Sequence, residues 1–181
     1  MLRRIKRLLF LVVATVLSGH NRAKLYKVSK KFGAIGDGCY LGTSNFGTEP
    51  FLIEMGDNVV VATGVRFINH DMSAEMISNR LHGVYERVSL YGKIKIGNNV
   101  FIGAGTIILP GISIGNDVVV GAGSIITKDL ESGWVYAGLG KKIKEFNIYQ
   151  EQVLEECQNQ RSLLWPPELK DNGWCLRRFD E

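Results

Sequence analysis

A pattern of six residues repeats through the middle of the chain, and it restricts the fold more than any other feature. From Ile96 to Ile126 an aliphatic residue occupies every sixth position without a slip, at 96, 102, 108, 114, 120 and 126. The position four residues further on is small or aliphatic in each repeat: Val100, Thr106, Ile112, Val118, Ser124 and Leu130. The same frame occurs earlier at Met55, Val61 and Phe67 and, in a weaker form, from Ile35. Repetition at a fixed period indicates a solenoid.

A period of six does not match an α-helix, which turns once every 3.6 residues. It suits a short extended segment followed by a corner, so that three such units complete one triangular coil. We expect the recurring aliphatic side chains to point into the prism and the small residues to fit inside its corners. The chain has 21 glycines and only 4 prolines, which fits frequent tight corners. Successive coils should pair as parallel strands.

Composition excludes several other classes of protein. The chain is 45% hydrophobic, which is too apolar for a disordered protein. Its net charge of +4, from 22 Lys and Arg residues against 18 Asp and Glu residues, is too small a surplus for a dedicated nucleic-acid binder. Three widely spaced cysteines predict neither a disulfide framework nor a cysteine zinc site, and they indicate a reducing compartment such as the cytoplasm.

Residues 1–32 precede the repeats as a separate segment. It has a basic start and then the apolar run Leu8–Leu17, about half the length needed to span a bilayer as a helix. Three interpretations stay open: a signal peptide, a helix packed on its own protein or on a partner subunit, and a helix lying in the membrane interface. In the last case, anionic head groups would meet the basic residues of the segment: Arg3, Arg4, Lys6, Arg7, Arg22, Lys24 and Lys27.

The repeats fill a predicted domain at 33–144, and the chain changes character in the C-terminal segment 145–181. Tyr149, Val153 and Cys157 lie four residues apart in a polar context, which predicts a helix with one apolar stripe. The proline pair that begins at Pro166 should end this helix.

The repeats, together with the segments that begin Thr48-Glu-Pro-Phe and Gly64-Val-Arg-Phe-Ile-Asn-His-Asp, resemble the hexapeptide-repeat acyltransferases. The resemblance covers about residues 35–144 and is strongest to the branch that acetylates sugars of bacterial surface polysaccharides, near the galactoside, maltose and xenobiotic acetyltransferases. It implies an all-β fold, a left-handed parallel β-helix, here with helical appendages at the N- and C-terminal ends. It also implies a homotrimer with active sites between subunits.

The resemblance further implies an enzyme that transfers acetyl from acetyl-CoA to a sugar hydroxyl of a glycan or polysaccharide precursor, with no metal required. Such an enzyme would work in the cytoplasm, at the inner face of the membrane if the N-terminus binds there. Two other functions stay open: N-acylation of an amino sugar, and a catalytically silent scaffold. The carbonic anhydrases that share this fold need three zinc-binding histidines, and only His70 and His82 lie in or near the repeats.

The repeat is interrupted once, by a predicted loop at 71–92, and His70 stands where this loop begins. A neutral imidazole can remove the proton of a hydroxyl as its oxygen attacks a thioester. The resemblance makes His70 the general base, while His82 within the loop is an alternative. We expect Asp71 and Tyr85 to bind the acceptor.

The donor needs a groove that can take the arm of coenzyme A. Gly103-Ala104-Gly105 and Gly121-Ala122-Gly123 lie one coil apart, and their lack of bulk would open such a groove. The resemblance implies that Ala104 and Ala122 line the pantetheine. It also places Thr127 and Lys128 near the nucleotide and Lys142 at the phosphates. The chain departs from the family pattern next to Lys142, where Gly140 replaces a proline.

Overall fold

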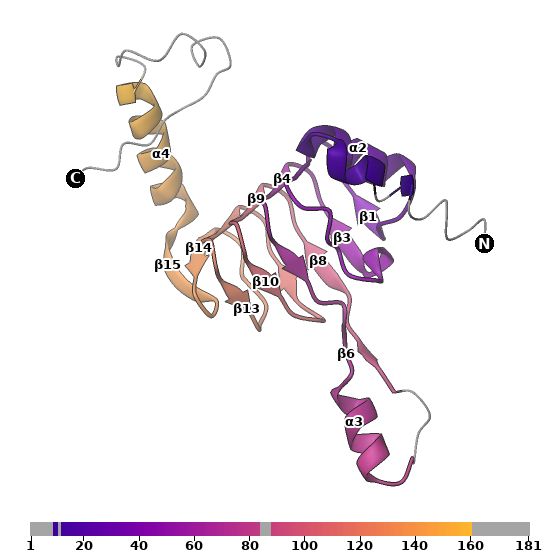
Figure 1. Ribbon diagram of the computed structural model, residues 1–181. Helices are drawn as coiled ribbons and strands as arrows, with labels where there is room; N and C mark the ends of the chain where they lie inside the picture. Colours follow the sequence, from indigo (N-terminus) through magenta and orange to yellow (C-terminus); the bar gives the residue numbers. More distant parts are fainter. Residues whose placement is uncertain (1–8, 11, 84–87, 161–181) are drawn as a thin grey trace.

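The computed structural model describes residues 9, 10, 12–83 and 88–160, with the backbone alone for 159 and 160. Its body is a prism of stacked coils (Figure 1). Helix α2 (Gly19–Val28) covers the N-terminal end of the prism, and α4 (Phe146–Gln160) leaves from the C-terminal end. A separate arm carrying α3 (Ser73–Arg80) projects from the side of the prism.

Each face of the prism is a parallel sheet built from one strand of each coil. The first face contains β1 (Ala34–Ile35), β3 (Ile53–Met55), β8 (Ile94–Ile96) and β11 (Ser113–Ile114). The second contains β2 (Tyr40–Leu41), β4 (Val59–Val61), β9 (Val100–Ile102), β12 (Val118–Val120) and β14 (Trp134–Ala137), against which β15 (Lys141–Glu145) turns back antiparallel. The third contains β5 (Arg66–Phe67), β10 (Ile107–Ile108) and β13 (Ile125–Ile126).

The interior of the prism confirms the predicted register. Val100 pairs with Val118, one coil of 18 residues further along the chain. The six recurring aliphatic side chains, from Ile96 to Ile126, are at most 4% exposed. The predicted corner residues Thr106 and Ser124 are fully buried, and their hydroxyls donate hydrogen bonds to the carbonyl of Gly121. A fully buried aliphatic side chain contributes about 1.5–3 kcal/mol, so this repeated stack is the main source of stability.

The segment before the repeats folds onto the N-terminal end of the prism. Arg22, Ala23 and Tyr26 of α2 are buried there, and Tyr26 packs against the rings of Phe32 and Phe46. Helix α2 therefore packs on the prism of its own chain. In the described part of the chain, no helix has the length and apolarity needed to cross a bilayer.

The interruption in the repeat is more ordered than an aperiodic loop. β6 (His70–Asp71) and β7 (Leu90–Tyr91) pair antiparallel and carry α3 outward between them. Three large apolar side chains of this arm, Met76, Ile77 and Leu81, are each more than half exposed. The arm therefore presents apolar surface away from its own prism.

Candidate active site

His70 is held in place where the second coil passes into the arm. The strand pair sets His70 opposite Tyr91, whose ring centroid lies 5.6 Å from that of the imidazole. The preceding residue, Asn69, is buried, and its side-chain amide donates a hydrogen bond to the carbonyl of Glu49. The backbone N–H of Gly92 donates in turn to the carbonyl of Asn69. These bonds fasten the base of the arm to the loop that contains Glu49.

The sequence did not identify Glu49 as the partner of the imidazole. His70 Nδ1 lies 2.8 Å from Glu49 Oε2, and both side chains are mostly covered, at 30% and 17% exposed. The second carboxylate oxygen, Oε1, accepts a 2.6 Å hydrogen bond from the hydroxyl of Thr48. A carboxylate accepts hydrogen bonds, so it favours the tautomer in which Nδ1 carries the proton. Nε2 is then left with a lone pair, as a general base requires.

The Glu49 carboxylate stays ionised in this arrangement. Partial burial acts to raise the pKa of Glu49, but hydrogen bonds from Thr48 and His70 outweigh it and hold that pKa below its ordinary value of 4.5. A fixed negative charge therefore faces the imidazole throughout the neutral range. Such a charge would stabilise the imidazolium that forms when His70 takes a proton.

An open pocket of about 600 Å³ lies beside His70. Its walls combine apolar and polar residues from three coils and the arm: Ile68, His70, Asp71, Met72, Leu90, Tyr91, Gly92, Leu109, Pro110, Gly111 and Thr127. The pocket is large enough for a small acceptor, and it brings one titratable base to a mixed polar and apolar surface.

Of the two residues predicted to bind the acceptor, the structure describes Asp71 alone. Asp71 lines the pocket, and its Oδ1 also accepts a 2.7 Å hydrogen bond from the backbone N–H of Ser73, which fixes the start of α3. Tyr85 lies outside the described residues. The alternative base, His82, is exposed just beyond the end of α3 and does not line the pocket.

Ala104 and Ala122 lie at the edge of the third face opposite to the edge that carries His70. Both stand at the corner before a third-face strand, β10 or β13, whereas His70 follows β5 and Thr127 follows β13. The corner is narrow, because a Cβ added at Gly103 would lie 2.4 Å from the backbone nitrogen of Ala122. Outside the corner, a Cβ added at Gly105 or Gly123 would meet nothing within 4 Å. The edge is therefore open, as the donor groove requires.

The remaining predicted donor residues do not share one location. Thr127 lines the His70 pocket, and Lys128 is exposed next to Gly140 near the last coil. Lys142 is already paired: its ammonium lies 2.8 Å from Glu131 Oε2 and 4.4 Å from the centre of the Trp134 ring. The Glu131 carboxylate raises the pKa of Lys142. A phosphate at this lysine would have to compete with an exposed carboxylate.

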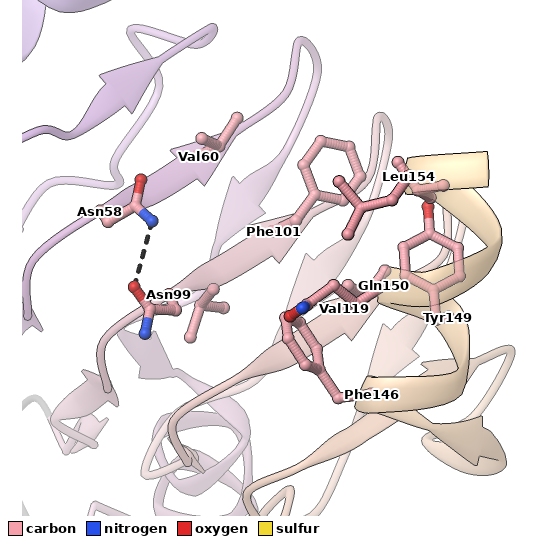
Figure 2. A pocket seen from close by; sticks show the side chains of 11 residues that line it. Asn58, Val60, Asn99, Phe101, Val119, Phe146, Tyr149, Gln150 and Leu154 are labelled. Atoms are coloured by element: carbon pink, nitrogen blue, oxygen red, sulfur yellow. Dashed lines mark hydrogen bonds between the residues drawn. The ribbon is translucent and has the colours of Figure 1, made fainter. Parts of the chain in front are cut away.

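A second hollow, of about 270 Å³, lies between α4 and the second face of the prism (Figure 2). Phe146, Tyr149 and Leu154 of α4 face Phe101 and Val119 of the sheet across it. Tyr149 and Val153 of the predicted apolar stripe therefore line a groove, and Phe101 stays 41% exposed. Among the described residues, no three His, Cys, Asp or Glu side chains are grouped so as to hold a metal ion.

Known proteins share both the repeat and the fold. The family model for the hexapeptide repeat of succinyl-transferase matches residues 93–128. Protein CapG of Staphylococcus aureus is 40% identical over 141 residues, which are 76% of this chain and 80% of that protein. A galactoside acetyltransferase solved with coenzyme A superposes with a TM-score of 0.57 at 21% identity and 82% coverage of each chain. A maltose O-acetyltransferase from Clostridium difficile 630 gives 0.51 at 25% identity, over 75% of this chain and 83% of that one.

Proposed function

The chain belongs to the hexapeptide-repeat acyltransferase family, and from this membership we propose that it acetylates a sugar hydroxyl of a glycan or polysaccharide precursor with His70 as general base. Its fold is the left-handed parallel β-helix of that family. Its class is sugar-modifying acetyltransferase, and its donor is acetyl-CoA. The acceptor and the roles of individual residues are the part that we propose.

The observation that carries the proposal is the His70–Glu49 pair beside the pocket. In the reaction, Nε2 of His70 accepts the proton of the acceptor hydroxyl while its oxygen attacks the thioester carbonyl carbon. The tetrahedral intermediate then collapses, the carbon–sulfur bond breaks, and the proton passes from the imidazolium to the departing thiolate of coenzyme A. Glu49 fixes the ring through Nδ1 and stabilises its charged form.

We assign the donor to the edge formed by Ala104 and Ala122. Within one chain this edge and His70 lie on opposite sides of the third face, so one copy does not bring them together. A homotrimer would solve this problem by placing the edge of one subunit beside His70 of its neighbour. The apolar groove along α4 and the exposed apolar residues of the arm supply surfaces that neighbouring subunits would cover.

We place the reaction in the cytoplasm, the compartment that the three widely spaced cysteines of the sequence predict. Asp71 and Tyr85 are assigned to the acceptor, and Thr127, Lys128 and Lys142 to the nucleotide end of the donor. For Lys142, this role requires the nucleotide to displace Glu131.

The test is the turnover of acetyl-CoA with a panel of nucleotide sugars, lipid-linked sugars and simple glycosides, followed by analysis of the product linkage. We expect free coenzyme A to be released only with particular acceptors, and we expect the product to be an ester that mild base hydrolyses. An amide product would replace the proposal with N-acylation. If no panel member raised turnover while acetyl-CoA still bound, the scaffold reading would gain support.

A further inference from the structure

The helical residues before α2 expose an apolar stripe. Residues 9, 10 and 12–16 are helical, and four large side chains among them are exposed: Leu9 63%, Val12 52%, Val13 42% and Val16 83%. Their spacing, i, i+3, i+4 and i+7, places them on one face of the helix. The other face packs on the protein, because Ala14 is fully buried and Phe10 meets Tyr26 edge to face at 5.2 Å.

A buried arginine holds this helix with the stripe outward. The Arg22 guanidinium donates hydrogen bonds to the carbonyls of Ala14 and Leu17 at 2.6 and 2.8 Å, and to that of Leu41 in the first coil. The guanidinium also donates longer hydrogen bonds to the carbonyls of Thr15 and Thr43, at 3.3 and 3.4 Å. Turning the apolar face inward would break the bonds to Ala14, Thr15 and Leu17 and leave a buried cation with only its partners in the first coil, which is costly. The stripe is therefore a fixed feature of the surface at this end of the prism.

The charge at the N-terminal end of the prism indicates what kind of surface the apolar stripe binds. The first 36 residues contain 9 of the 22 Lys and Arg residues and no Asp or Glu, whereas the remaining chain carries 13 basic and 18 acidic residues. Lys24, Lys27 and Lys30 are exposed there, although Lys27 also pairs with Asp37. A second copy would bring the same positive charge to the contact and be repelled. An anionic lipid surface complements both the charge and the apolar stripe.

We propose that the stripe formed by Leu9, Val12, Val13 and Val16 binds the surface of an anionic bilayer, with the helix lying in the interface. This inference does not depend on the acetyl transfer reaction. The experiment is flotation of the full chain with vesicles of phosphatidylcholine alone, and with vesicles in which phosphatidylglycerol replaces half of that lipid. We expect binding to the mixed vesicles, weak binding to the neutral ones, and loss of binding between about 0.1 M and about 1 M salt.

Point variants test the stripe better than removal of residues 1–20, which would take away carbonyl partners of the buried Arg22. We expect Val12→Asp with Val16→Asp to weaken vesicle binding about tenfold or more. The matched control is Leu139→Asp, which changes a 68% exposed apolar side chain at the other end of the prism and should bind as the wild type does. Circular dichroism establishes that each variant is folded.

Two outcomes would overturn the proposal. One is a wild-type chain that does not float with the mixed vesicles. The other is unchanged vesicle affinity in the folded double variant, which would leave the basic residues alone responsible. If the double variant did not fold, Leu9→Asp with Val13→Asp would be measured in its place. A change of oligomeric state in the double variant, without vesicle binding by the wild type, would assign the stripe to a protein contact.

Discussion

At the scale of single residues, the pair formed by His70 and Glu49 determines what the site can do. The 2.8 Å contact fixes the ring and its tautomer, and Thr48 holds the carboxylate from its other oxygen. Glu49 was not recognised in the sequence, because its segment leaves the six-residue frame and ends in a short 3-10 helix at Pro50–Leu52. His70 was predicted because the resemblance to the acyltransferase family points to it, and because it stands where the repeat breaks off after Phe67.

Glu49→Gln tests the positioning role of the carboxylate. An amide can still accept a hydrogen bond from Nδ1, but it cannot stabilise the imidazolium by charge. We expect kcat to fall about tenfold or more with little change in the KM for acetyl-CoA. The control is Glu54→Gln, which breaks an exposed pair with Lys93 at 2.7 Å in the same region. Equal kinetics in the two variants would remove Glu49 from the mechanism.

The lowered pKa of Glu49 also predicts a pH dependence of stability. Because folding lowers this pKa below its ordinary 4.5, the ionised carboxylate stabilises the fold above that pH, and the contribution is lost as pH falls through the folded pKa. We expect the Tm difference between wild type and Glu49→Gln to be present near neutral pH and to shrink below about pH 4. Thermal unfolding followed by circular dichroism measures it. A Tm difference that is independent of pH would contradict this reading.

At the scale of elements, side-chain hydrogen bonds reinforce one corner of the prism. In each coil, a side-chain oxygen at this corner accepts a hydrogen bond of 2.7–2.9 Å from the backbone N–H of the equivalent residue one coil earlier. The accepting residues are Asp57, Asn98, Asn116 and Ser132. The bonds form a continuous ladder from coil to coil between the first and second faces. The ladder explains why Asn, Asp and Ser recur at this corner.

Asn98→Ala interrupts the ladder in its middle. It leaves the backbone N–H of Asp57 without its side-chain acceptor, and we expect the free energy of unfolding to fall by about 1 kcal/mol. Urea unfolding measures the change, with Asn147→Ala, an exposed asparagine at the start of α4, as the control. A loss no larger than that of the control would show that the ladder follows from the coil geometry and does not stabilise it.

From the sequence we could predict the coils of the prism and the helix after residue 145, which each have a clear period, but not the elements of the arm. The buried positions from Ile96 to Ile126 and the parallel register follow from a repeat in which each coil imposes the same environment on equivalent residues. The helix α3 and the strand pair of β6 and β7 could not be predicted in this way, since the arm lies outside the periodic core. The open groove along α4 was also missed, because a helical stripe does not reveal how closely the helix approaches its sheet.

At the scale of the whole molecule, the two halves of the proposed site lie on opposite edges of one face. Chains with His70→Ala and chains with Ala122→Trp should therefore be inactive alone. In a homotrimer with sites between subunits, every trimer that contains both variants would rebuild about a third of its sites, since each site needs His70 from one subunit and Ala122 from the next. Acetyl-CoA turnover by isolated mixed trimers measures this. No recovery in such trimers would place the donor and the base in one chain.

The central claim, that His70 removes the proton of the acceptor, is tested most directly by the kinetics of His70→Ala together with its affinity for acetyl-CoA. We expect kcat to fall by about 10²–10⁴, the range for loss of a general base, while calorimetry gives the wild-type affinity for the donor. A His70→Ala enzyme that turned over acetyl-CoA and its acceptor at the wild-type rate would contradict the account.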